Sequence, residues 1–162
     1  MTSQSDPSPL SPDASVLEAQ RRQHLRRELI SHFIQEGYEI RGAAGVTGYP
    51  PSPAIANDGY GSGRPRAPQV IGWDVMRRRI IFGIVRESRS KLDSEDSLEE
   101  YNVLLDHNSR MGEQASMLVV ALPEELLGEF ASLITHYIHR EYWHRVVAIG
   151  SRVTDTLPPE NQ

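Results

Sequence analysis

The chain has 162 residues, no cysteine and a formal net charge of −5. This length suits one domain with its own core, and the absence of cysteine excludes disulfide frameworks, thiolate metal sites and cysteine nucleophiles. No apolar run approaches the roughly 20 residues of a membrane span, and the polar N-terminus lacks the basic start and apolar centre of a signal peptide. We therefore expect a soluble, cytoplasmic protein without a membrane partner.

The first part of the chain predicts a tail, a helix and a strand. Residues 1–14 are rich in Ser, Pro and Asp, which is typical of a disordered segment. Ser15, with Glu18 three residues later, has the pattern of a capping box at a helix start, and the apolar residues that follow recur at three- and four-residue steps. Gly37 is the expected C-terminal stop of this helix, and a short strand is predicted at 38–43.

A long Gly- and Pro-rich segment at 45–65 separates this strand from a predicted hairpin. Loops of such length are uncommon in compact domains unless they are functional or disordered. We expect the two hairpin strands at 69–73 and 79–86 and their turn at 74–78, so the strands must pair antiparallel.

The second half predicts helix, strand, helix and strand. SLEEYNVLLDHNSRM has one apolar helical face with Asp96 or Ser97 as its cap, and ASMLVVAL has the length of a buried strand. Pro123 is expected to open the next helix, and HRVVAIG completes a right-handed parallel crossover with the strand before it. The sequence thus predicts one domain at 15–150 and a tail at 151–162. Its fold class is α/β, in three α/β/α layers around a central mixed sheet, with the order α-β-β-β-α-β-α-β.

The stretches APQVIGWD and RIIFGIVRES, in this order of elements, resemble the PD-(D/E)xK nuclease superfamily, which has the restriction-endonuclease-like fold. In that family an aspartate at the start of the second strand and a Glu-x-Lys motif on the third form a Mg²⁺-dependent active site. The resemblance implies that Gln69 stands at the aspartate position, Ile84 at the glutamate position and Arg86 at the lysine position.

The three motif positions lack the chemistry of that active site. Mg²⁺ is usually held by one or two carboxylates together with waters and phosphate. The amide of Gln69 offers no charge, Ile84 cannot bind a metal, and the guanidinium of Arg86 stays protonated and makes a poor base. The resemblance therefore implies a degenerate site with no catalytic residue, no bound metal and no cofactor.

A shifted set of carboxylates is the alternative in which the chain is an active DNA endonuclease. Glu28, Asp74 and Glu87 would then hold Mg²⁺ and activate a water molecule. Strand alternation weighs against this set, because Ile84 and Arg86 share one face whereas Glu87 faces the other way. Asp74 also falls in the turn, where an aspartate commonly bonds to nearby backbone amides.

Positive charge is almost all arginine, with Lys91 as the only lysine, and guanidinium is well suited to phosphate. The arginines that we expect to face a nucleic acid are Arg64, Arg66, Arg77, Arg78, Arg79 and Arg86. For Arg86 two interpretations stay open: a grip on phosphate beside Gln69, or an ion pair with Glu87 or with the acidic run at 93–100.

Three functions are compatible with these patterns. The first hypothesis is a catalytically inactive PD-(D/E)xK-like domain that serves as a nucleic-acid- or protein-binding subunit. The second is the Mg²⁺-dependent endonuclease with the shifted carboxylate set. The third is a protein-interaction module, unrelated to nucleic acid, whose contact surface is the acidic helix and the Gly/Pro segment. The oligomeric state is open in all three.

Overall fold

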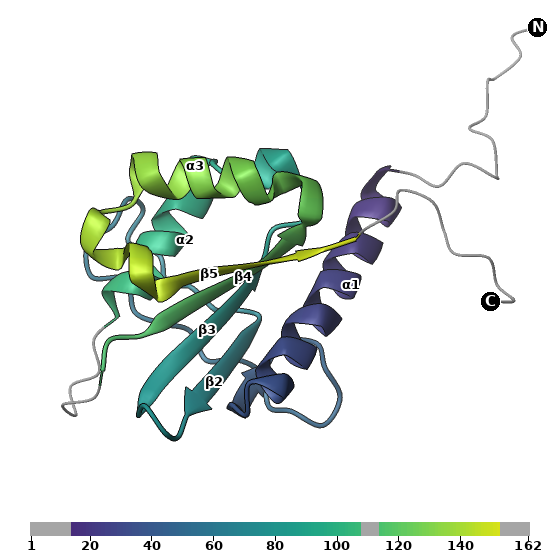
Figure 1. Ribbon diagram of the computed structural model, residues 1–162, viewed down its shortest axis with the longest axis vertical. Helices are drawn as coiled ribbons and strands as arrows, with labels where there is room; N and C mark the ends of the chain where they lie inside the picture. Colours follow the sequence, from purple (N-terminus) through teal and green to yellow (C-terminus); the bar gives the residue numbers. More distant parts are fainter. Residues whose placement is uncertain (1–13, 108–113, 153–162) are drawn as a thin grey trace, which may run out of the picture.

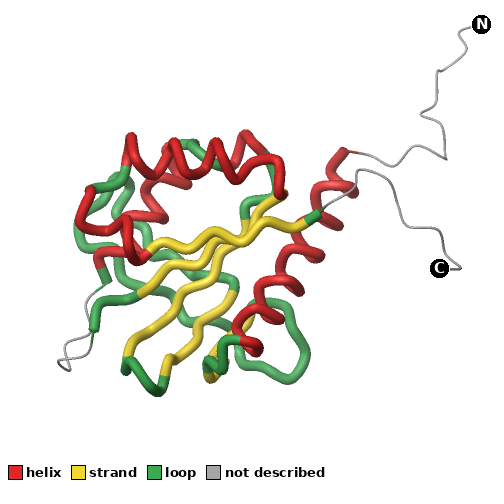
Figure 2. Tube along the Cα trace, viewed as in Figure 1, coloured by secondary structure: helices red, strands yellow, loops and turns green. Residues whose placement is uncertain are grey.

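The computed structural model describes residues 14–107 and 114–152, and it shows one five-stranded sheet with helices on both sides (Figure 1 and Figure 2). The strands lie in the order β1-β2-β3-β4-β5, with antiparallel pairing from β1 to β3 and parallel pairing from β3 to β5. The α/β class with a mixed sheet is therefore confirmed, as are the antiparallel hairpin and the parallel pairing of the last two strands. The elements along the chain are α1 (Ala14–Gln35), β1 (Glu39–Ala43), β2 (Val70–Asp74), β3 (Arg79–Val85), η1 (Arg89–Lys91), α2 (Glu95–Asp106), β4 (Met117–Pro123), η2 (Glu124–Leu126), α3 (Leu127–Tyr137), η3 (Arg140–Arg145) and β5 (Val146–Ser151).

One face of the sheet is covered by α1. Leu25, Leu29 and Phe33 recur at four-residue steps, so they form one helical stripe, and all three are fully buried. They pack against strand side chains that point toward this face, among them Val70 and Ile81. This stripe fixes how α1 lies across the sheet.

The opposite face is covered by α2 and α3. Tyr101 of α2 meets Phe130 of α3 edge to face, with ring centroids 5.8 Å apart. Both rings belong to one buried cluster with Phe82 and Ile84 of β3, whereas Val85 lies in the cluster under α1 because successive strand residues point to opposite faces. The sheet thus lies between two helical layers, as Figure 1 shows.

Two glycines let α1 approach the sheet closely. A Cβ added at Gly83 would lie 2.9 Å from Leu29 Cδ2 and 3.0 Å from Phe33 Cζ. A Cβ at Gly72 would lie 2.8 Å from Phe33. A side chain at either position would therefore push the helix away from the strands.

The first helix ends as expected but does not begin as expected. α1 already includes Ser15 in its first turn, so Ser15 is not the cap that the sequence predicted, because a cap residue has non-helical backbone angles. Gly37 has a φ of +77°. Tyr38 N donates to Phe33 O at 3.0 Å and Gly37 N donates to Ile34 O at 3.1 Å, which is the Schellman pattern of a helix end.

The cap of α2 also differs from the prediction. Oγ of Ser94 accepts a hydrogen bond from Ser97 N at 3.1 Å, so Ser94 is the N-cap, and neither Asp96 nor Ser97 is. Ser97 donates from its own Oγ to Lys91 O at 2.5 Å, which ties the first turn of α2 to the preceding 3-10 helix.

Pro123 ends a strand and does not open an α-helix. It is the last residue of β4, its ψ of 139° is extended, and the 3-10 helix η2 separates it from α3. α3 ends at Tyr137 because the backbone of Ile138 is extended, which turns this side chain into the core, where it is 4% exposed.

The predicted tails fall almost entirely outside the described residues. Of the N-terminal tail at 1–14 only Ala14 is described, as the first residue of α1. Of the C-terminal tail at 151–162 only Ser151, the last residue of β5, and Arg152 are described. Within the described ranges no helix has both the length and the apolar character that crossing a membrane requires.

Candidate functional site

A pocket of about 540 Å³ lies where β3 ends and α2 begins. It brings together two of the three motif positions, Gln69 and Arg86, with Glu87 of the alternative carboxylate set. Ile84, the third motif position, is fully buried in the cluster under α2 and α3 and does not line the pocket. The charged residues of the lining are Arg22, Arg86, Glu87, Lys91, Asp96 and Glu100.

Gln69 is bonded to the backbone of the sheet. Its side-chain Oε1 accepts a hydrogen bond from Val85 N at 3.2 Å, and its backbone carbonyl accepts one from Ala44 N at 2.7 Å. The neutral amide therefore joins β2 to the end of β3, at the position where the resemblance implies a metal-binding aspartate.

Arg86 is a buried structural cation. Its Nη2 donates to Glu100 Oε1 at 2.6 Å, its Nε donates to the Tyr101 hydroxyl at 3.1 Å, and its Nη1 donates to Val85 O at 3.1 Å. Burial alone would lower the pKa of Arg86, but Tyr101 and Glu100 outweigh it, so the pKa lies above its ordinary value. Two interpretations were open for Arg86, and the structure shows the second: an ion pair with the acidic run, through Glu100.

Glu87 faces the opposite side of the sheet, toward α1. Arg22 donates from Nε and Nη2 to Glu87 Oε1 at 3.4 and 3.2 Å. The carboxylate is 5% exposed, so its charge is compensated inside the protein and not by solvent.

The three carboxylates of the alternative set do not share one site. Asp74 lies at the far end of the hairpin, where its Oδ1 accepts hydrogen bonds from two backbone N–H groups of the turn, each at 3.1 Å. Glu87 follows the other end of β3, roughly 25 Å away along an extended strand. Glu28 is exposed on α1, with His24 Nε2 at 3.6 Å. In the described part of the chain, no group of three or more His, Cys, Asp or Glu is placed to hold a metal ion.

Three of the arginines expected to face a nucleic acid surround the hairpin turn, at the other end of β3 from Arg86. Arg77 Nη1 and Arg79 Nε lie 3.4 and 3.9 Å from Asp74 Oδ2. Arg78 is exposed, has a φ of +54°, and pairs with no carboxylate among the described residues. The turn therefore has an excess of positive charge, because it carries three guanidinium groups and only one carboxylate, which is buried.

Arg64 and Arg66 tie the Gly/Pro segment to the start of α2. Both bond to Asp96, and Arg66, which is 5% exposed, also bonds to Glu99. Ser62 donates to Glu99 from N and Oγ at 2.6 and 2.8 Å. The hydrogen bond from Arg66, followed by those from Ser62, lowers the pKa of Glu99 to about 2, and Arg66 also lowers the pKa of Asp96. The acidic start of α2 therefore holds the chain's own loop, which leaves fewer carboxylates free for a protein partner.

Two residues at this site were not singled out from the sequence: Arg22, which lines the pocket, and Tyr101, which bonds to Arg86. Glu100 belongs to the acidic run that was offered as a partner of Arg86, but the run as a whole did not say which of its carboxylates would pair. Glu100 and Tyr101 stand in a predicted helix, but local spacing does not say which strand residue its face will meet. Arg22 lies 65 positions from Glu87, and no local pattern signals so distant a pair.

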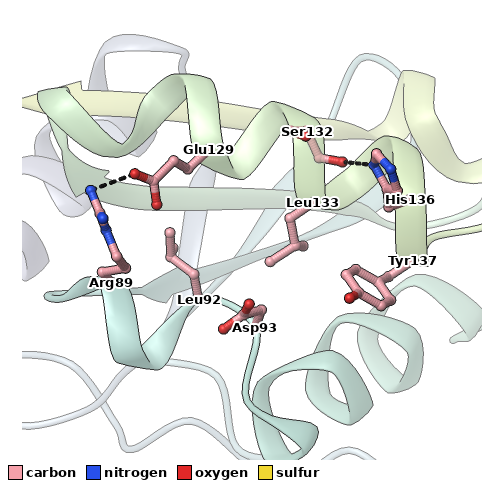
Figure 3. Close-up of a pocket in the computed structure, with 8 residues that line it drawn as sticks. All are labelled: Arg89, Leu92, Asp93, Glu129, Ser132, Leu133, His136 and Tyr137. Atoms are coloured by element: carbon pink, nitrogen blue, oxygen red, sulfur yellow. Dashed lines mark hydrogen bonds and ion pairs between the residues drawn. The ribbon is translucent and has the colours of Figure 1, made fainter.

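A second pocket, of about 340 Å³, lies between η1 and α3 (Figure 3). Arg89 Nη2 reaches Glu129 Oε1 across it at 2.5 Å, and Nδ1 of His136 is 3.0 Å from Ser132 O of its own helix. Arg89 is thus engaged by a carboxylate and His136 by the backbone of its own helix.

Comparison with protein-family models, with curated proteins and with solved structures finds no match to this chain. The function therefore has to be inferred from the site itself.

Proposed function

We propose that this chain is a catalytically inactive domain of the PD-(D/E)xK kind that binds nucleic acid through the tip of its β2–β3 hairpin. An antiparallel hairpin followed by parallel strands, with helices on both faces of the sheet, supports the likeness to the restriction-endonuclease-like fold. Because a fold alone does not fix a function, the proposal depends on the pocket and on the hairpin.

The observation that carries the proposal is the charge balance of the pocket at the end of β3. Arg22 compensates Glu87, Arg86 compensates Glu100, and Gln69 is neutral. Mg²⁺ needs carboxylate oxygens that are free to bind it, and an arginine that already donates to a carboxylate competes with the ion both by occupying lone pairs and by charge. The pocket is thus poorly suited to the metal that phosphodiester hydrolysis in this family requires.

The hairpin tip has the composition of a nucleic-acid contact. Met76 is 90% exposed and Val75 is 57% exposed, and Arg77 and Arg78 follow them directly, both exposed. A two-stranded β-ribbon fits the major groove of DNA, where apolar side chains can contact thymine methyl groups, and arginine binds phosphate. Figure 1 shows this turn at the lower end of β2 and β3, away from α2 and α3.

Replacing Arg77 and Arg78 together by Gln should weaken duplex DNA binding by about tenfold at low salt and lower the slope of log K against log salt by about 2, because two phosphate contacts are lost. Fluorescence anisotropy of a labelled duplex, over a series of salt concentrations, measures both quantities. Met76→Ala should weaken binding with the salt slope unchanged, because it removes an apolar contact.

Arg140→Gln is the matched control, since Arg140 is an exposed arginine of η3 with no acidic partner among the described residues. It should leave both affinity and salt slope unchanged. A protein that binds no duplex at low salt, or that binds equally well in the Arg77/Arg78 double variant, would rule out the hairpin as a nucleic-acid contact and favour a protein partner.

A further inference from the structure

A third pocket, of about 320 Å³, lies between α1 and the loop that follows β1. We propose that it binds the phosphate group of a small phosphorylated ligand. Arg26 and Arg27 line it on the helix side, and Gly45 and Thr47 line it on the loop side. No carboxylate lines this pocket, although the chain as a whole is acidic. A local excess of positive charge in an acidic protein favours an anion.

Arg26 and Arg27 line one pocket together, and neither is paired with a carboxylate in the described part of the chain. Most arginines in the described part of the chain are held by a carboxylate, as Arg22 is by Glu87. Nε of Arg26 is buried without any acceptor there. Nε of Arg66 and of Arg79 also lacks an acceptor, but each of those guanidinium groups lies against a carboxylate. Because buried donors are nearly always bonded, the guanidinium of Arg26, which lies against none, favours an anion from outside the described chain.

The loop that follows β1 places its backbone against the guanidinium of Arg26. Gly45 has a φ of +67°, in the left-handed region that favours glycine. A Cβ at Gly45 would lie 2.7 Å from Arg26 Nη1, so the guanidinium rests directly on the bare backbone. The N–H groups of Gly45 and Thr47 donate to no acceptor among the described residues. Free backbone amides beside a glycine in this conformation are a recurring feature of anion sites.

The walls and the size restrict the ligand. Ile34, which is 59% exposed, lines the pocket together with Ile30 and Val46, so a ligand can place an apolar group beside its anionic one. The volume is at the lower end of the range for small-molecule sites, about 300–1,000 Å³. Two guanidinium groups suit a phosphate in particular, because each can donate two parallel hydrogen bonds. The ligand class is therefore a phosphate monoester with an apolar or aromatic body.

Titration with inorganic phosphate and with phenyl phosphate, followed by the amide NMR signals of Gly45 and Thr47, tests the proposal. Both ligands should shift these signals in a saturable way, and phenyl phosphate should bind at least about fivefold more tightly, because its ring buries apolar surface against the isoleucines. The single variants Arg26→Gln and Arg27→Gln should each weaken the binding of phenyl phosphate by about tenfold. Gly45→Ala, which crowds Arg26 directly, should weaken it as well.

Two controls separate this pocket from the hairpin and from general charge. Arg140→Gln and the Arg77/Arg78 double variant should bind phenyl phosphate as the unmodified chain does, whatever the outcome for DNA. Equal affinity in Arg26→Gln, or shifts that fail to saturate, would overturn the proposal. A single-stranded oligonucleotide that binds more tightly than phenyl phosphate, with the same dependence on Arg26, would overturn the assignment to a small ligand and give the pocket to nucleic-acid phosphate.

Discussion

Replacing Arg86 by Met should lower the free energy of unfolding by about 3 kcal/mol, because removal of one partner from a buried ion pair leaves the other charge uncompensated. The side chains of Arg86 and Glu100 are only 9% and 16% exposed. The Tyr101 hydroxyl, which accepts from Arg86 and donates to Leu92 O at 2.8 Å, would also lose a partner. Urea or thermal denaturation measures the change.

An exposed ion pair gives the matched control for Arg86. Arg89 and Glu129 have side chains that are 73% and 42% exposed and lie 2.5 Å apart. Arg89→Met should change stability by no more than about 0.5 kcal/mol, because surface pairs contribute little. The double variant Arg86→Met with Glu100→Gln should lose less stability than the sum of the single variants, because the two residues act as a pair. An Arg86→Met protein that is as stable as the unmodified chain but has lost DNA binding would return Arg86 to the phosphate-binding interpretation.

Replacing Gly83 by Ala should lower the free energy of unfolding by about 2 kcal/mol, because the added methyl group overpacks the contact between α1 and the sheet. The new Cβ would lie 2.9 Å from Leu29 Cδ2. If α1 moves outward in response, Arg22 is drawn away from Glu87 and the candidate site changes with the core. Denaturation measures the loss of stability, and the amide signals of Arg22 and Glu87 report the displacement.

A glycine with open space around it is the control for Gly83. Gly128 lies in α3 and a Cβ there would meet nothing within 4 Å, so Gly128→Ala should raise stability by about 0.5 kcal/mol through helix propensity. Leu29→Ala should relieve the crowding, so that adding Gly83→Ala to it costs less than Gly83→Ala does alone. A Gly83→Ala protein with unchanged stability would show that α1 does not depend on the bare backbone at this position.

Local patterns of the sequence are sufficient to predict the fold class and the side of the sheet to which each residue of β3 points. Apolar periodicity placed the first helix, and Gly37 marked its end because a left-handed residue there closes the last turn. Alternation along β3 placed Ile84 and Arg86 on one side of the sheet and Glu87 on the other, as the structure has them. These features depend only on neighbours within a few residues.

The pairing of charges could not be predicted in the same way. The charge of Glu87 could be compensated by a metal ion or by an arginine. It is compensated by Arg22, which reaches Glu87 only because α1 packs against the sheet. The engagement of Arg66 by Glu99 likewise depends on how the Gly/Pro segment folds back on α2. Composition therefore showed many arginines, but their pairing in the fold decides which of them can meet a phosphate.

We infer that Arg22 and Arg86 neutralise Glu87 and Glu100, so that the pocket binds no metal ion. Titration with Mn²⁺ tests this directly, because Mn²⁺ broadens the NMR signals of nuclei close to its binding site. We expect no selective broadening at Gln69, Arg86 and Glu87, and no nicking of plasmid DNA with either Mn²⁺ or Mg²⁺. Strong broadening confined to these three residues, accompanied by nicking that disappears in Glu87→Gln, would show that the pocket holds a catalytic metal.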